Sequence, residues 1–219
     1  MNLLVRLVIE AAIVMLALAL GAVLLWPGAA SEGLGGAVAA AMPDSGVKHP
    51  VTAVLLNFRG YDTLLEMLVL LLALIGVRSL GELPVSAVPD SPSPVLRELL
   101  RFLTPFLLLV SIYLLWRGSS GPGGAFQAGA VLGAAGVLWL LAERPVNQLP
   151  DGRPVRPLLV TGVGFFAIAG MVLAFSEGAF LAYPGAHAGT LIFAIETLAT
   201  ISIAATLLVL FVGAPTSNP

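Results

Sequence analysis

The sequence predicts an all-α integral membrane protein with about six transmembrane helices and both termini in the cytoplasm. Hydrophobic residues make up 58% of the 219 residues and charged residues only 10%, whereas a soluble domain carries roughly 25% charged residues. The apolar stretches are continuous and do not alternate with polar residues. Because lipid offers the backbone no hydrogen-bond partners, only helices or closed barrels cross a bilayer, and continuous apolar runs favour helices.

Six apolar segments approach the length of about 20 residues that a transmembrane helix needs. They cover residues 3–26, 62–80, 99–116, 126–142, 158–176 and 190–212. We expect the first to be retained as a helix, because its uncharged run, residues 11–26, is longer than the roughly 7–15 residues of a signal peptide. Residues 51–58 form an apolar octet that is too short to span, which suits a re-entrant or interfacial piece.

The connection between the second and third segments marks a predicted module boundary. It contains four prolines, at positions 84, 89, 92 and 94, and repeated prolines favour an extended linker. The predicted organisation is a two-helix module at residues 1–83, a proline-rich linker at 84–95 and a four-helix module at 96–219.

The basic residues predict the orientation, since cytoplasmic loops carry an excess of Lys and Arg. With the N-terminus inside, seven basic residues fall on the cytoplasmic side: Arg6, Arg78, Arg97, Arg101, Arg144, Arg153 and Arg156. Three fall outside: Lys48, Arg59 and Arg117. Outer-side reagents should then label cysteines placed near Gly121 and His187, but not near Asp151.

Composition also excludes several function classes. The net charge of -2 offers no basic field for nucleic acid. The absence of cysteine excludes disulfides, zinc–thiolate sites and iron–sulfur clusters, and His49 and His187 are too few and too far apart for a metal motif. No phosphate-loop or serine-elbow motif occurs. We therefore expect no cofactor, no metal site and no enzyme activity.

Glu66 is the first candidate for an ion or proton path. It stands with Arg59 and Asp62 before an uncharged run, residues 67–77, that is too short to span alone. Glu66 is thus drawn into the membrane, where an ionisable residue is a functional candidate by default. A competing interpretation makes Thr63 the N-cap and Glu66 the N3 residue of a capping box, or Asp62 the cap. The residues leave both roles open.

Two further carboxylates are candidates for the same path. Glu196 lies six residues into the last segment, and Thr200 follows on the same face. A proton relay and a hydrogen bond to a neighbouring helix are equally open for it. Glu10 lies about two turns into the first segment, where snorkelling to the inner surface favours a structural role.

The loop at residues 118–129, G-S-S-G-P-G-G-A-F-Q-A-G, contains five glycines and a proline. This composition cannot continue a helix and predicts a tight turn, although its bare amides also suit an anion or the close approach of another subunit. The candidate loop residues are Gly121, Pro122, Gly123, Gly124, Phe126, Gln127 and Gly129. Small residues predict close helix packing at two places: Gly129 with Gly133, and Gly162 with Gly164 and Gly170.

The motif G-P-G-G-A-F-Q-A-G resembles the P-G-G-G-F-Q-x-G signature of the MnhB/MrpB subunit of multisubunit Mrp-type sodium/proton antiporters, with Ala125 in place of the usual glycine. The I-E-T sequence at residues 195–197 resembles the family's last helix and carries over Glu196. This resemblance covers residues 96–212.

The upstream sequence V-T-A-V-L-L-N-F-R-G-Y-D-T-L-L-E, residues 51–66, resembles a segment of the large Mrp A subunit and of the MbhE subunit of membrane-bound hydrogenases. It carries over Arg59, Gly60, Asp62, Thr63 and Glu66, while Asn57 replaces a common Asp.

The resemblance implies a subunit of a complex related to the membrane arm of complex I, in a prokaryotic inner membrane. Its partners would be other Mrp-type subunits (A/D-like, C-like, E, F and G-like) and lipid. The function would be Na+/H+ antiport, through an ion path or assembly. The alternative is a scaffold in a hydrogenase-type or carbon-uptake complex.

Overall fold

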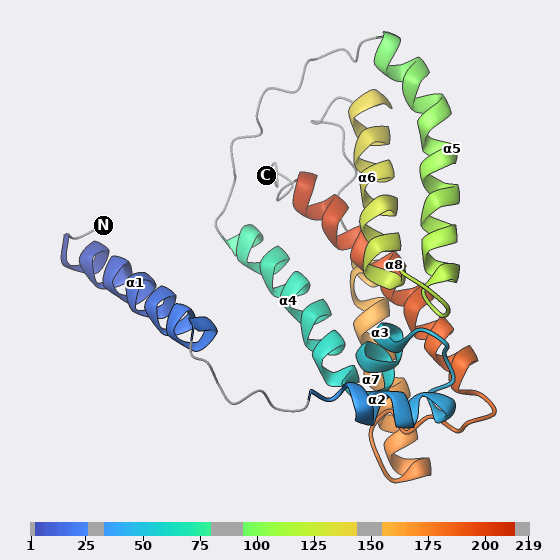
Figure 1. The fold of residues 1–219 in the computed structure, drawn as a ribbon. Helices are drawn as coiled ribbons and strands as arrows, with labels where there is room; N and C mark the ends of the chain where they lie inside the picture. The colour runs from blue at the N-terminus through green and yellow to red at the C-terminus, as the bar shows by residue number, and fades with distance from the viewer. Residues whose placement is uncertain (1–2, 26–32, 80–93, 144–154, 213–219) are drawn as a thin grey trace. The chain divides into compact units, whose positions relative to one another are not determined.

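The computed structural model describes residues 3–25, 33–79, 94–143 and 155–212, and these ranges contain helices and no strands. The elements are α1 (Leu3–Leu25), α2 (Gly35–Ala41), the 3-10 turn η1 (Met42–Asp44), α3 (Pro50–Ala53), the π-helical turn η2 (Val54–Phe58), α4 (Gly60–Ser79), α5 (Pro94–Arg117), α6 (Ala125–Glu143), α7 (Arg156–Glu177) and α8 (Ala188–Val212). Figure 1 shows them in chain order. The predicted all-α class is confirmed.

The chain is a multi-pass membrane protein. Five helices, α4 to α8, are long and apolar enough to cross a bilayer. The first predicted segment forms α1, which is 23 residues long. The side of the membrane on which each terminus lies stays a prediction.

The chain divides into two units, Met1–Ala39 and Ala40–Pro219. The first contains α1, whose described side chains from Leu7 onward are nearly all exposed. The second contains α4 to α8. Most of the predicted linker, residues 84–93, lies outside the described residues, so the predicted module boundary stays a prediction.

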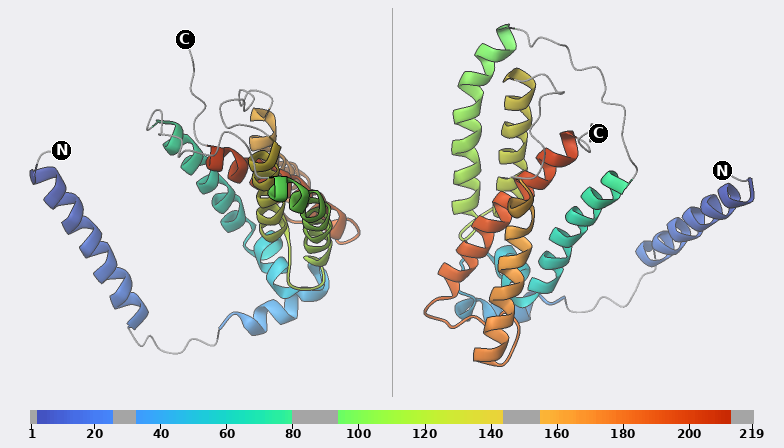
Figure 2. Two further views of the ribbon diagram at one scale, coloured as in Figure 1. Left: turned by 90° about the horizontal axis from the view of Figure 1, so that it is seen from above. Right: turned by 180° about the vertical axis from the view of Figure 1, so that it is seen from behind.

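Helix α8 is the central element of the second unit. It packs against α4, α5, α6 and α7, and Figure 2 shows it crossing α6 and α7. Within the most apolar 18-residue stretch of each span, 61% of the α8 residues are buried, against 28% or fewer for the other four helices. The core therefore forms around α8, with Phe166 of α7 and Ile192 and Ile195 of α8 among its fully buried side chains.

Glycines bring the neighbouring helices close to α8, as two of the sequence patterns predicted. A Cβ atom on Gly129 would lie 2.8 Å from Cγ2 of Ile203, and one on Gly133 would lie 3.3 Å from the carbonyl oxygen of Ala204. On α7, a Cβ atom on Gly162 would lie 2.8 Å from Cβ of Ser202. Gly164 differs, because no atom lies within 4 Å of its Cβ position. The expectation that Gly164 shares the packed face is wrong, since it stands two residues from Gly162 on another side of the helix.

Three connecting segments gather at one end of the bundle, which we call the loop end: residues 42–59, 118–124 and 178–187. The backbone N–H of Lys48 donates to the carbonyl of Ser119 at 2.8 Å. A Cβ atom on Gly46 would lie 2.9 Å from the backbone nitrogen of Gly189. Gly121 and His187 thus belong to the same end, as the predicted topology requires, whereas Asp151 lies outside the described residues.

Candidate functional site

The segment before α4 turns the chain through a π-helical turn. Helix α3 begins at Pro50 and continues into η2, where the N–H of Arg59 donates to the carbonyl of Val54 at 2.7 Å. Arg59 itself leaves the helical conformation, with φ -131° and ψ 37°, and α4 follows at once. Turns of this i→i+5 type are rare and occur frequently at functional sites. The sequence showed an apolar octet here, but nothing in it distinguished a π turn from an α-helical one.

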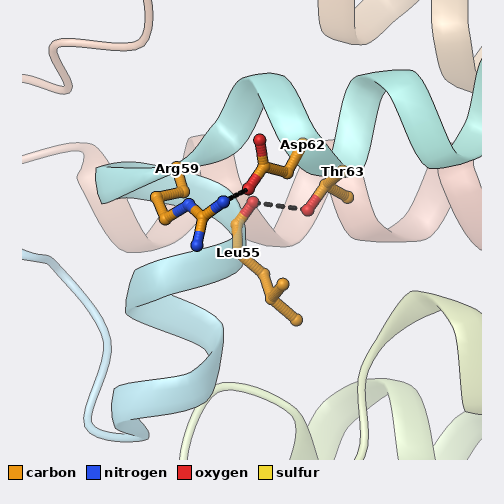
Figure 3. Close-up of polar contacts among 4 residues, drawn as sticks. All are labelled: Leu55, Arg59, Asp62 and Thr63. Atoms are coloured by element: carbon orange, nitrogen blue, oxygen red, sulfur yellow. Dashed lines mark hydrogen bonds and ion pairs between the residues drawn. The ribbon is translucent and has the colours of Figure 1, made fainter. Parts of the chain in front are cut away.

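Thr63 fastens this turn to α4 (Figure 3). Its hydroxyl donates to the carbonyl of Leu55 at 2.6 Å, and its side chain is buried. Because α4 begins at Gly60, three residues before Thr63, the prediction that Thr63 is the N-cap of a capping box is wrong. Asp62 lies in the first turn of α4, where the helix dipole favours an acidic side chain, and it forms an ion pair with Arg59.

Glu66 remains apart from these contacts. It lies in the second turn of α4, within the predicted span Gly60–Ser79, and its side chain is exposed. In the ranges that the structure describes, no ion pair or side-chain hydrogen bond includes it, since Arg59 pairs with Asp62. Of the three charged residues that the sequence singled out, Arg59 and Asp62 therefore form an ion pair, and Glu66 is exposed on the surface of the bundle.

Glu196 is buried, with a relative exposure of 3%, and it meets the glycine-rich loop. The backbone N–H of Ala125, the first residue of α6, hydrogen-bonds to its carboxyl group. Oε1 lies 3.2 Å and 3.0 Å from the Cβ positions of Gly118 and Gly124. The carboxyl group thus occupies the amino end of α6, where backbone N–H groups lack partners within the helix. The structure brings the two MnhB-like motifs together, 71 residues apart in the chain.

The hydroxyl groups near this carboxyl group donate their hydrogen bonds to backbone carbonyls. Thr200 donates to the carbonyl of Glu196 at 2.8 Å, and Thr52 donates to the carbonyl of Gly118 at 2.5 Å. Ser111 of α5 donates to the carbonyl of Ala128 at 2.9 Å. Oε2 of Glu196 is buried and has no hydrogen-bond partner among the described residues.

The loop itself is a tight turn, as predicted. The N–H of Gly121 donates to the carbonyl of Arg117 at 2.8 Å, and that of Gly124 to the carbonyl of Leu114 at 2.9 Å. Gly123 and Gly124 have φ values of +157° and +111°, which only glycine adopts readily. The predicted suitability of the loop amides for an anion stays a prediction, and one N–H at the end of the loop, that of Ala125, hydrogen-bonds to the carboxyl group of Glu196.

The remaining loop residues differ in exposure. Pro122 and Gln127 are exposed, whereas Gly129 is buried against α8 and Phe126 packs against the core. Glu10 lies on α1 in the unit Met1–Ala39, with an exposed side chain, and stays a candidate. No group of three or more His, Cys, Asp or Glu side chains that could hold a metal ion occurs among the described residues.

Tyr183, in the α7–α8 loop, is a half-buried residue with a buried hydroxyl group that sequence reasoning missed. Its hydroxyl has no hydrogen-bond partner within the described ranges, and burial raises its pKa well above the usual value of a tyrosine. A single tyrosine in a loop carries no periodic pattern that would predict its burial.

Comparison with known proteins supports the resemblance. Residues 95–217 match the family model described as a domain related to the MnhB subunit of Na+/H+ antiporters. The chain is similar over its whole length to part of the Mrp complex from Dietzia sp. DQ12-45-1b, with 24% identity and a TM-score of 0.65. It covers 27% of that longer chain, so it spans about a quarter of its length. No curated protein matches the chain.

A second solved structure matches at nearly equal length. It is a chain of the membrane-bound sulfane sulfur reductase, an archaeal respiratory membrane complex, with 26% identity and a TM-score of 0.68. The match covers 93% of this chain and 94% of that chain. Because the family model covers more than half of the sequence and its loop and glutamate motifs meet at one site, this chain belongs to the family of proteins with a domain related to the MnhB subunit of Na+/H+ antiporters.

Proposed function

We propose that this protein is a membrane subunit of a multisubunit Na+/H+ antiporter-type complex in a prokaryotic cell membrane, and that Glu66 lies on the path of the transported ion. The family model and the likeness to an Mrp complex support the first part. They favour it over a scaffold role in a hydrogenase-type or carbon-uptake complex.

The observation that carries the role of Glu66 is its position. It lies six residues after the start of α4, or about 9 Å along the helix at 1.5 Å per residue. It caps no helix, and its side chain is exposed on the bundle surface. An ionisable side chain within the membrane is costly in lipid and normally faces a water-filled path or a partner. A path at the boundary with a neighbouring subunit satisfies this requirement.

The partners that we propose are therefore the other subunits of such a complex, A/D-like, C-like, E, F and G-like, with lipid around the remaining apolar surface. Both similar structures are complexes of several subunits. The exposed α4 face provides the contact surface, with Leu65, Val69 and Leu72 beside Glu66.

The test replaces Glu66 by Gln, which keeps the shape and hydrogen-bonding capacity but cannot carry a proton. We expect Glu66→Gln to remove Na+-dependent proton movement in membrane vesicles while the complex assembles at its normal level on a native gel. Glu177→Gln is the matched control, since Glu177 is exposed at the end of α7 and should leave transport unchanged. Full transport by the assembled Glu66→Gln complex would refute the role of Glu66.

A further inference from the structure

We propose that Glu196 is an internal proton-binding site, which a proton reaches from the exposed side chain of Gln127 past Gly124. This site lies within the MnhB-like helices, and it does not require that Glu66 carry an ion. Its ligand is a proton delivered by water.

The geometry at Gly124 is the first support. A Cβ atom on Gly124 would come within 4 Å of only two described atoms outside its own neighbours, Oε1 of Glu196 at 3.0 Å and Oε1 of Gln127 at 3.7 Å. Gln127 is exposed, whereas Glu196 is buried. A polar side chain at the surface and an acid in the interior thus both approach Gly124, and the absence of a side chain there lets the carboxyl oxygen lie close to the backbone.

The hydrogen-bond balance of the carboxyl group is the second support. An ionised carboxyl needs donors on both oxygens, but only one backbone N–H, from Ala125, reaches it, and Oε2 has none in the described part of the chain. Leaving a buried acceptor unsatisfied costs about 1–3 kcal/mol. The hydroxyls of Thr52 and Thr200 donate elsewhere. A proton on Oε2 removes the need for a donor.

A metal ion fits the same place poorly. A hard cation prefers several oxygen ligands around it, and the carbonyl of Gly118 already accepts the hydroxyl of Thr52. The amino end of α6 also carries partial positive charge, which opposes a bound cation and favours the ionised carboxyl group, so it is the unpartnered Oε2 that favours protonation. The chemistry of the site therefore favours a proton.

Other charges do not neutralise Glu196. The titratable groups toward the loop end, on the helices and segments that pack around α8, are Asp44, Lys48, His49, Arg59, Tyr61, Asp62, Glu66, Tyr113, Arg117, Glu177, Tyr183 and His187. Arg117 belongs to the glycine-rich loop, but its guanidinium lies over Gly121 and donates to Ser120 at 3.1 Å. Arg59 pairs with Asp62, and Arg101 pairs with Glu98.

Infrared difference spectroscopy of the assembled complex, recorded while the pH is stepped from acid to alkaline, tests the proposal without a transport assay. We expect the carbonyl band of a protonated carboxylic acid to disappear on the alkaline side, and Glu196→Gln to abolish that band. Glu66→Gln is the comparison variant, and it separates this site from the proposed transport role. A titrating band that survives Glu196→Gln unchanged, or no such band in the native complex, would overturn the proposal.

A second variant serves if Glu196→Gln prevents assembly. Gln127→Met changes an exposed side chain and should leave the fold intact. We expect it to shift the band and to slow its exchange in heavy water, because the polar side chain at the proposed entry is lost. Identical band position and exchange in Gln127→Met and the native complex would refute entry past Gln127.

Discussion

The hydroxyl of Thr52 donates a hydrogen bond of 2.5 Å to the carbonyl of Gly118, although 66 residues separate them in the chain. Thr52 lies on α3, in the segment that leads to Glu66, and Gly118 opens the loop that holds Glu196. Both positions are buried. One hydrogen bond thus joins the segment that resembles MbhE to the loop that resembles MnhB.

Replacing Thr52 by Val should weaken this junction. The valine keeps the volume of threonine but leaves the carbonyl of Gly118 with one donor fewer, at a cost of about 1–3 kcal/mol. We expect a lower thermal midpoint of the complex in detergent. Thr52→Ser should restore most of the loss, because it returns the hydroxyl. Equal midpoints for the Val and Ser variants would contradict the prediction.

Two glycines of α7 should respond in opposite ways. Gly162→Ala places a methyl group 2.9 Å from Cα of Ala199 and close to Ser202, and such overpacking costs about 1–3 kcal/mol. Gly164→Ala meets no atom within 4 Å and should be neutral or stabilise the helix by up to about 1 kcal/mol. Unfolding of the purified chain in mixed micelles measures both. The packing argument fails if the Gly164 variant is the less stable of the two.

Gly124→Ala should disturb the Glu196 site beyond the effect of backbone strain. Gly124 and Gly178 both have positive φ, +111° and +84°, but only Gly124 has atoms within 4 Å of its Cβ position. Gly178→Ala therefore reports the strain alone, of about 1 kcal/mol. We expect Gly124→Ala to lose at least twice that stability in the same assay. Similar losses of stability for the two variants would contradict the prediction, because they would show that the carboxyl group of Glu196 moves aside without loss of stability.

The buried hydroxyl of Tyr183 predicts sensitivity to alkali. Burial raises its pKa in the folded chain above the ordinary value of about 10. As the pH rises past the ordinary value, the unfolded chain releases this proton first, so the folded state loses stability. Tyr183→Phe should reduce this alkaline loss and leave stability at neutral pH unchanged or slightly higher. Tyr113→Phe, at an exposed position, controls for the substitution, and an unaltered pH dependence in Tyr183→Phe would count against the prediction.

Cysteine labelling should show that the loop end faces one side of the membrane. The native chain has no cysteine, so its background is clean. Ser120→Cys and His187→Cys should react with an impermeant reagent from the outer side. Arg156→Cys, at the opposite end of α7, should react only after permeabilisation. Labelling of Ser120→Cys and His187→Cys from different sides would contradict the observed gathering of the loops.

Much of this fold follows from the sequence because membrane helices depend on composition. Continuous apolar runs predicted the long helices, and the Gly129–Gly133 spacing predicted that α6 packs closely against a neighbour, which the structure shows to be α8. Gly164 shows the limit of that reasoning, since spacing alone does not tell which small residues face a neighbour.

The site was predictable in its members but not in its contacts. The motifs selected Glu66 and Glu196, yet the first is exposed and the second is buried. The capping-box pattern predicted that a helix starts at Thr63. In the structure the π turn ends just before Gly60, so α4 begins three residues earlier. The hydroxyl of Thr63 therefore donates to the carbonyl of Leu55 and does not cap the helix. Such a shift depends on tertiary packing at the loop end, which local sequence does not encode.

The contacts at the loop end have a consequence for how this chain can be built. Residues 42–79 attach to residues 94–212 through Thr52, Lys48 and the Gly46–Gly189 approach, as well as through the packing of α4 on α7 and α8. None of these attachments needs an unbroken peptide between the two parts. A protein divided between α4 and α5 and produced from two reading frames should reassemble and co-purify, and a fused form and a two-gene form of this subunit would be structurally equivalent.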